Sequence, residues 1–438
     1  MEPRLQRRYE QLVMEHLSPA QRVAAGLRSL PALAEGFAST QAAWRFYANE
    51  NASLPRLAQP LIGCARAQAK PSCRRRLLVV VDWCNLHYKQ HASKSDRIAL
   101  ANSQDLGYKL LTALAVSDRD GSPLAPLCLE LQAADGVHST RSERPLEASS
   151  GLDGLDPLMR HVESQDLGRE LVWIIDREAD SVGHYRLWAA AGRKLLVRAD
   201  EDRRVLHEGR ECKLAEVADA LKRQGRLVRQ RNVLFKGKSA RQFVGEATVV
   251  LHRPARQHRV GPDGRARHHN VAGAPLSMRL VVSEVRDKKG KLLARWLLLS
   301  NLPPQVKAGT VALWYYWRWR IETYHKLLKG AGQQLECWQQ ETAEALARRL
   351  TVSAMAAVVV WQLARDSRPE AQQMREVLVR LSGRQMKRGK KARGFSEPAL
   401  LAGLGVLVPM LELLKTHDVT ELNRLADLLL PRLHYEAG

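Results

Sequence analysis

The chain has 438 residues, enough for two or three domains and a substantial hydrophobic core. It contains 69 Lys and Arg against 46 Asp and Glu, which gives a formal net charge of +23. An excess of this size indicates a polyanionic partner, most simply nucleic acid, although a generally basic proteome would account for part of it. The six cysteines are scattered without a C-x-x-C pair, which argues against a zinc site and against a disulfide framework.

Secretion and membrane insertion are not expected from the sequence. The N-terminal segment MEPRLQRRYEQ lacks the apolar stretch of a signal peptide. The apolar run at 354–363 is shorter than the roughly 18 residues of a membrane span. We therefore expect a soluble cytoplasmic protein with no membrane partner.

The N-terminal part of the chain has a helical pattern. Apolar residues recur at helical spacing in the segments 4–17, 19–35, 41–50 and 54–67. Ser39-Thr40 stands before the third segment as its expected N-cap. Small helical units with arginines on the outside are typical of DNA-binding domains, and a plain helical bundle fits the same pattern. We interpret 1–70 as a helical DNA-binding domain.

Beyond Arg76, predicted strands and helices alternate. Short apolar runs predict strands at 77–82, 108–132 (two strands joined by a turn at Asp118–Pro123), 171–175 and 194–199. Helices are predicted at 151–165 and 181–192, and a loop at 132–151. This alternation indicates an α/β core.

The alternation is interrupted at about 200–300. Short runs of alternating polarity, with turns at 262–264 and 288–290, predict a β-rich insertion there. Two long helices are then predicted at about 308–329 and 340–365.

The C-terminal part is predicted to be helical. A basic, Gly-containing stretch at 383–394 is typical of a loop or linker, and helical spacing returns at 397–435. We therefore expect a second domain over 71–365 and a helical C-terminal region over 366–438.

Two aspartates stand at the ends of predicted strands. Asp82 follows LLVVV and Asp176 follows LVWII. A carboxylate in this position is held by a rigid element yet reaches solvent, at the edge where α/β folds place their chemistry. Each has an ordinary alternative, since Asp often ends a strand or caps a following helix, and a helix is predicted to begin near Ser181.

A third acid lies on a predicted long helix. Tyr315, Arg318, Glu322 and Lys329 follow one another at steps of three, four and seven, which places them on one helix face. An adjoining apolar face contains Trp314, Trp317, Ile321, Tyr324 and Leu328. A carboxylate among cations suits a divalent metal together with a polyanionic substrate. The structural alternative is a surface helix with Arg318–Glu322 and Glu322–Lys326 ion pairs.

Asp82, Asp176 and Glu322 together offer only hard oxygen ligands, which suit Mg²⁺ or Mn²⁺ and not zinc. Two such ions can activate a water or a 3′-hydroxyl and stabilise the leaving oxygen of a phosphodiester. The chain has no Gly-rich phosphate loop, which disfavours an NTP-driven enzyme. The acids therefore predict metal-dependent phosphoryl transfer with two ions per site.

Two motifs carry a resemblance to a known family. Asp176 lies in DREADSVGHY, and Glu322 lies in Y-x-x-R-x-x-x-E-x-x-x-x-x-x-K. In this order, with a β-rich stretch between them, they resemble the bacterial DDE transposases of the insertion-sequence-four family, whose signature is named Y-R-E-K. The similarity runs from about residue 30 to about residue 365. It implies an RNase H-like catalytic core with Asp82, Asp176 and Glu322 as metal-binding acids. The sequence after Asp82, WCNLHY, departs from the small hydroxyl residues that the family more often has.

The resemblance also implies a set of DNA contacts. Phosphates of the transposon end would meet Tyr315, Arg318 and Lys329, and Arg198 falls where the family has a DNA-contacting arginine. Trp296 falls where the family stacks a flipped base, and a plain core residue is the alternative for it.

The resulting prediction is a cut-and-paste DNA transposase in the bacterial cytoplasm, associated with the nucleoid. It would bind terminal inverted repeats in double-stranded DNA, cleave the ends through a hairpin and join them to target DNA. By analogy with the family, it would act as a homodimer assembled on DNA, with 366–438 as a possible dimerisation region. The alternatives are an RNase H-like nuclease or resolvase without strand transfer, and a non-catalytic DNA-binding derivative. All three acids are present, which disfavours the derivative.

Overall fold

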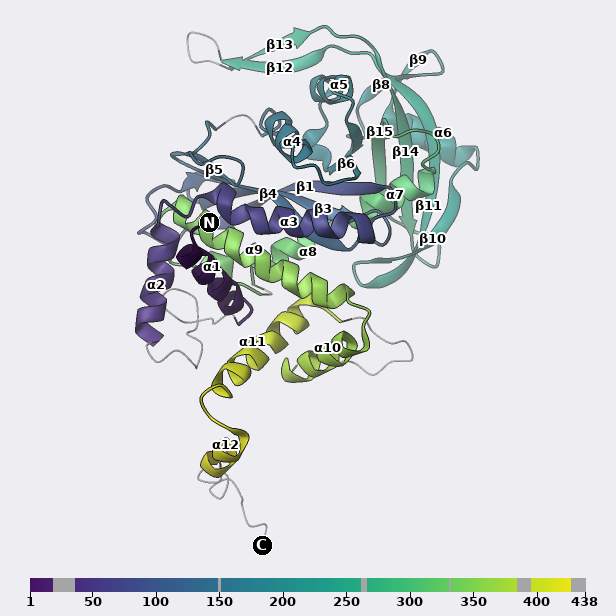
Figure 1. Ribbon diagram of the computed structural model, residues 1–438. Helices are drawn as coiled ribbons and strands as arrows, with labels where there is room; N and C mark the ends of the chain where they lie inside the picture. The colour runs from purple at the N-terminus through teal and green to yellow at the C-terminus, as the bar shows by residue number, and fades with distance from the viewer. Residues whose placement is uncertain (19–35, 149–150, 261–265, 331, 384–394, 427–438) are drawn as a thin grey trace.

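The computed structural model describes residues 1–18, 36–148, 151–260, 266–330, 332–383 and 395–426. Within these ranges the chain has a mixed α/β fold around one large sheet, with helices on both faces of the sheet (Figure 1). The segments expected to be a helix at 19–35 and a turn at 262–264 lie outside the described residues, as do the end of the chain from 427 onward and all of the linker expected at 383–394 except Gly383.

The middle of the sheet contains, in spatial order, β4 (Pro123–Ala133), β3 (Leu106–Ser117), β1 (Arg76–His87), β6 (Glu170–Ile175) and β7 (Lys194–Arg198). β3 pairs antiparallel with β1 and β4, whereas β6 and β7 run parallel to β1. The segments that lead into β6 and β7 contain α4 (Leu155–Glu163) and α5 (Val182–Ala190). From Arg76 to Val81, β1 is buried on both sides, as its run of apolar residues predicts.

The part at 200–300 is rich in strands, as predicted, and it extends the same sheet. β15 (Leu292–Ser300) pairs antiparallel with β7, with Leu298 opposite Arg198. The order continues through β14 (Leu276–Arg286) and β11 (Lys238–Leu251) to β8 (Arg204–His207) and β9 (Arg210–Lys213). β10 (Val228–Phe235) pairs with β11, and α6 (Leu214–Arg223) follows β9.

Two further strands form a separate antiparallel ribbon. These are β12 (Ala255–Val260) and β13 (Ala266–Val271), which pair with each other and, within the part of the chain that the structure describes, with no strand of the large sheet. The ribbon contacts α5 and extends above it in Figure 1.

The long helix α9 (Ala343–Arg365) joins the N-terminal helices to the sheet. It contacts α1 (Pro3–His16), α2 (Gly36–Ala48), α3 (Leu54–Ser72) and β4. Leu54 and Leu61 of α3 belong to the same core as the apolar residues of β1. α3 therefore shares a core with the sheet, whereas buried residues of α1 and α2 form a second cluster with residues of α9. The separation of 1–70 as a domain stays a prediction.

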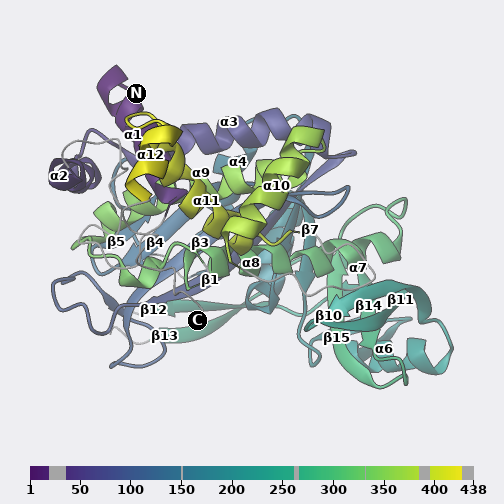
Figure 2. The same cartoon turned by 90° about the horizontal axis from the view of Figure 1, so that it is seen from below.

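The C-terminal helices pack beneath α9. α10 (Pro369–Leu381) and α11 (Glu397–Leu413) contact each other and α9, and α12 (Val419–Ala426) lies beyond them. Figure 2 shows α10 and α11 side by side from below. Over the described residues, no helix combines the length and the apolar character needed to cross a bilayer.

Three local predictions were wrong. α2 begins at Gly36, so Ser39-Thr40 lies within the helix and not at its N-cap. The short strand β5 (Gly136–Ser139) lies in the predicted loop, because it pairs with β4. β1 does not end at Asp82, because residues 82–87 keep their ladder with β3, and β3 also pairs with the short β2 (Ile98–Ala99).

Candidate active site

The register of two parallel strands brings Asp82 and Asp176 together. The pairing of β1 with β6 ends at Val81 opposite Ile175, so the next residue on each strand is one of the acids. Asp176 stands just beyond the end of its strand, as predicted. Asp82 lies inside the longer β1, opposite Thr112 of β3, so its position depends on that ladder and not on a strand end.

The third acid comes from a pair of helices, where one continuous helix was predicted. α7 (Ala308–Trp317) and α8 (Trp319–Leu328) are separated at Arg318. The backbone N–H of Arg318 donates to the carbonyl of Tyr315, three residues back, which tightens the chain at this point. Ile321 is buried where α8 packs against β1 and β3, while Glu322 keeps 29% of its side chain exposed.

The Arg318 guanidinium binds all three carboxylates. Nη1 lies 3.0 Å from Asp82 Oδ2, and Nη2 lies 3.3 Å from Asp176 Oδ2 and 2.9 Å from Glu322 Oε1. The Arg318 side chain is 6% exposed, so these ion pairs are screened far less than pairs on the surface. The Arg318–Glu322 ion pair considered from the spacing is present, and the same cation also reaches two acids from the strands.

The two aspartates have opposite pKa shifts although both contact Arg318. Burial raises the pKa of Asp82 to about 6, with Asp176 and Glu322 adding to the increase, against the opposing effects of Arg318 and the Trp83 N–H. Burial also acts on Asp176, but its pKa is lowered, because Arg318 and several other donors outweigh that effect. Of the two aspartates, Asp82 is therefore the one that binds a proton more readily.

The other donors to Asp176 include two of the predicted DNA-contacting residues. The Tyr315 hydroxyl donates to Asp176 Oδ1 over 3.0 Å, and Nη1 of Arg198 lies 3.6 Å from the same oxygen. Tyr315 is buried, whereas the side chain of Arg198 is 34% exposed. In this structure both residues contact the carboxylate of Asp176, and of the two only Arg198 is partly exposed to solvent.

Lys329 does not share the helix face of Glu322. It stands after the last residue of α8, with non-helical backbone angles. Its Nζ lies 3.1 Å from Glu336 Oε1 and donates to the carbonyl of Asn85 over 2.5 Å. The step of seven residues from Glu322 therefore does not place Lys329 on that face, because the helix ends first.

Trp296 lies in β15 and packs in the core. Its side chain is among the buried residues, and its ring centroid lies 5.7 Å from that of Tyr315. This arrangement agrees with the core alternative weighed from the sequence. Stacking on a flipped base stays a prediction, and it would require the ring to become accessible.

One residue near the acids, His325, was not singled out from the sequence. His325, on α8, is buried, and its Nε2 lies 3.3 Å from Thr112 Oγ1. Burial, together with the positive charges of Lys329 and Arg318, lowers the pKa of His325 to about 4. Helical spacing does not identify this histidine, because its contact with Thr112 depends on the packing of α8 against β3.

The acids suit a hard divalent cation in their chemistry. They supply only oxygen donors, as Mg²⁺ and Mn²⁺ prefer. Over the described residues, no three His, Cys, Asp or Glu side chains stand close enough to hold a metal ion as they are arranged. The cation that the three carboxylates share in this structure is the guanidinium of Arg318, so a metal ion requires that guanidinium to move.

Comparison with known proteins gives little further information. No protein-family model and no curated protein matches the chain. One solved structure with some similarity is a cryo-EM structure of the piggyBac transposase synaptic complex with hairpin DNA. The identity is 10% and the TM-score 0.31, and the match covers 81% of this chain and 57% of that chain.

Proposed function

We propose that the chain is a DDE-type DNA transposase, related to the insertion-sequence-four family, that cuts and joins DNA ends by metal-dependent phosphoryl transfer. The observation that carries this proposal is the convergence of Asp82, Asp176 and Glu322. They come from β1, the end of β6 and α8, and they meet at one guanidinium. The alternative of a surface helix with incidental ion pairs does not explain why Arg318 also contacts two acids from neighbouring strands.

The proposal includes an RNase H-like core. This part of the proposal is supported by the middle of the sheet. There β1, β3 and β4 form successive antiparallel pairs, and β6 and β7 run parallel to β1. The acids lie where the parallel strands β1 and β6 separate, the kind of place at which open α/β sheets bind ligands.

Asp82, Asp176 and Glu322 would hold two Mg²⁺ or Mn²⁺ ions, which supply an activated hydroxyl and stabilise the leaving oxygen. Arg318 must first leave the carboxylates. Its Nε has no hydrogen-bond partner among the described residues, and a guanidinium can donate to a phosphate through two N–H groups. We propose that Arg318 passes from the acids to a phosphate of the transposon end, with Arg198 and Lys329 as further phosphate contacts.

The proposed partner is double-stranded DNA, as transposon end and as target. The formal net charge of +23 supports it, since many phosphate contacts need many cations. A homodimer assembled on DNA and a route through a hairpin belong to the same proposal.

The test uses the purified full chain, Mg²⁺ and linear DNA that carries the inverted repeats flanking the coding region. Nicked, hairpin and joined products are expected on a denaturing gel, and Glu322→Gln is the matched inactive control. Cleavage without joining would instead identify a nuclease. Binding without cleavage in either Mg²⁺ or Mn²⁺ would identify a non-catalytic DNA-binding protein.

A further inference from the structure

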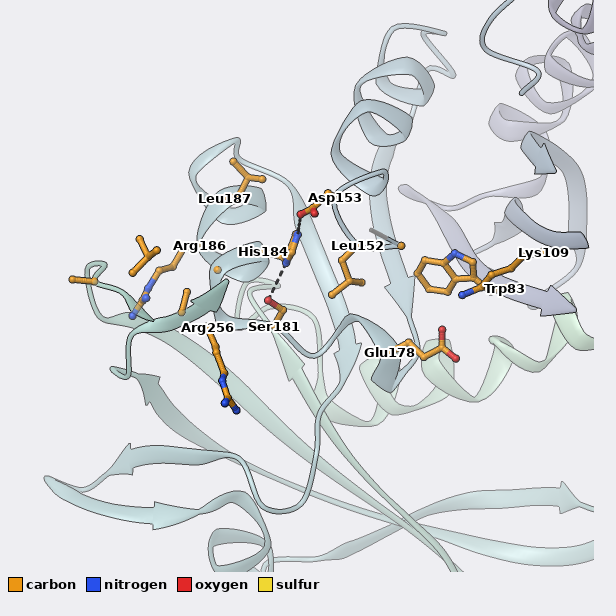
Figure 3. Close-up of a pocket in the computed structure, with 15 residues that line it drawn as sticks. Trp83, Lys109, Leu152, Asp153, Glu178, Ser181, His184, Arg186, Leu187 and Arg256 are labelled. Carbon is orange, nitrogen blue, oxygen red and sulfur yellow. Dashed lines mark hydrogen bonds and ion pairs between the residues drawn. The ribbon is translucent and has the colours of Figure 1, made fainter. Parts of the chain in front are cut away.

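A pocket of about 900 Å³ lies between β1, α5 and the ribbon β12–β13. Figure 3 shows Trp83 and Lys109 at one end of it and Arg186, Leu187 and Arg256 at the other, with Leu152, Ser181 and His184 between them. We call this pocket the trough. Its volume is in the range of about 300–1,000 Å³ typical of small-molecule sites, so it suits a few unpaired nucleotides and not a duplex.

One end of the trough lies beside the acids. Trp83 follows Asp82 along β1, and Glu178, which also lines the trough, comes two residues after Asp176. Because successive residues of a strand face opposite sides, Trp83 and Asp82 lie on different faces of the sheet. The pairing of β1 with β6 ends at Val81 opposite Ile175, so from Asp82 onward β1 is no longer paired on the side of β6.

Trp83 and Lys109 form a platform at this end. Trp83 lies opposite Leu111, which places Lys109 diagonally across from it on the same face of the sheet. Lys109 Nζ lies 5.7 Å from the centroid of the Trp83 ring. Both side chains are only partly buried. An aromatic face beside an ammonium group can stack a base and bind the adjoining phosphate.

The middle of the trough is held in place by hydrogen bonds. His184 Nδ1 lies 2.9 Å from Ser181 Oγ, and its Nε2 lies 3.0 Å from Asp153 Oδ1. Its ring also packs against Trp188, with 5.4 Å between the centroids. This wall is therefore positioned before any ligand arrives.

Arg186 fixes the far end by tying the ribbon to α5. Its Nε donates to the carbonyl of Ala274 over 2.8 Å, and its Nη2 donates to the carbonyl of Arg253 over 3.0 Å, so it holds the chain on both sides of the ribbon. Gly273 permits this approach, since a Cβ there would lie 2.8 Å from Arg186 Nη1. From the ribbon, Ala255, Arg256 and Val271 line this end, and Arg256 is the cation among them.

We propose that the trough binds an unpaired DNA strand that continues from the phosphodiester held at the acids. The strand would stack one base on Trp83, place a phosphate at Lys109 and run toward Arg256 and the ribbon. The trough joins an aromatic platform, apolar walls and cations, the combination that binds single strands without sequence preference. This inference rests on the proposed function, because the neighbouring site must act on DNA.

The test measures binding of a duplex with a single-stranded extension that contains 2-aminopurine, in EDTA so that no cleavage occurs. For the unmodified chain we expect the fluorescence to fall as the base stacks, and tighter binding than to a blunt duplex. Trp83→Ala should weaken binding of the extension about tenfold and abolish the fluorescence change, while Trp83→Phe keeps most of both. The blunt duplex should bind all three proteins equally.

Lys109→Gln is a second variant, which removes one cation at a partly exposed position. In this variant the slope of log binding constant against log salt concentration should become about 0.7 less steep, the value for one phosphate contact on a single strand. Lys288→Gln, in the turn between β14 and β15, is the matched control and should bind like the unmodified chain. Circular dichroism of each variant shows whether it is folded.

The outcomes separate this inference from the proposed function. If transposon ends are cleaved but Trp83→Ala and Lys109→Gln bind the extension like the unmodified chain, the trough is not a strand-binding site and the proposed function stands. If binding of the extension depends on Trp83 but ends are never cleaved, the trough is supported as a nucleic-acid site and the proposed function fails.

Discussion

Arg318 Nη1 lies 3.0 Å from Oδ2 of Asp82, the acid of the site whose pKa is raised. The same guanidinium reaches Asp176 and Glu322. Three negative groups in a largely buried place need a positive partner, and here that partner belongs to the chain itself. Arg318 therefore both holds the acids together and occupies the place that a metal ion needs.

The three acids should be required for cleavage and not for DNA binding. We expect Asp82→Asn, Asp176→Asn and Glu322→Gln each to abolish nicking, because an amide cannot replace the charge of a carboxylate ligand. Gel shifts on end DNA, set beside a cleavage assay, measure both properties. Near-normal cleavage by Asp82→Asn would show that the first acid is assigned wrongly, and Glu178 or Asp180 would be the next residue to test.

Loss of Arg318 should strengthen metal binding in the absence of DNA. The family resemblance implies only a phosphate contact for Arg318, whereas the observed contacts with all three acids add an effect on metal binding. With the guanidinium removed, Arg318→Ala should bind Mn²⁺ about tenfold more tightly, because a competing cation is gone. End-complex assembly should fall in the same variant.

Titration calorimetry of the free variants with Mn²⁺ measures this effect, with Arg318→Lys as the control that keeps the charge. Unchanged Mn²⁺ affinity together with normal end complexes would mean that Arg318 only holds Glu322 in place.

Trp296→Ala should destabilise the fold. The ring is buried against Tyr315, and truncating a core tryptophan costs about 3–5 kcal/mol. Urea unfolding measures the loss, and Trp296→Phe should recover much of it. A variant of normal stability that nicks DNA but forms no hairpin would instead support the base-stacking role.

His16 should make the protein sensitive to mild acid. Its imidazole is buried between Gln333 and Tyr47, and burial lowers its pKa from 6.5 to about 3, with Arg349 adding to the effect. The unfolded chain then takes up a proton on His16 below about pH 6.5, while the folded chain does so only near pH 3. The contribution of neutral His16 to the free energy of unfolding is therefore fully present above pH 6.5. As the pH falls this contribution is lost, and at pH 5 the free energy of unfolding is lower by about 2 kcal/mol.

His16→Gln removes the titrating group and keeps a side chain able to form hydrogen bonds. The free energy of unfolding, measured by urea at pH 7 and pH 5, should change about 2 kcal/mol less for this variant than for the unmodified chain. An equal change in both proteins would show that His16 does not titrate in this range.

The sequence predicted the elements whose patterns are local. The apolar runs before Asp82 and Asp176 gave the strands that bear them, and the spacing around Arg318 and Glu322 gave their ion pair. The length of β1 could not be predicted, because residues after Asp82 stay in the strand only through pairing with β3. The break at Arg318 and the departure of Lys329 from α8 are changes of backbone geometry that a spacing rule, which assumes an unbroken helix, cannot detect.

The pairing of β15 with β7 has a consequence for local unfolding. Arg198, beside Asp176, lies on a strand whose hydrogen bonds run directly to the part at 200–300. That part can separate from the acids only by breaking a ladder in the buried centre of the sheet. The amides of β7 and β15 should therefore exchange their hydrogens as one cooperative unit, among the slowest in the molecule.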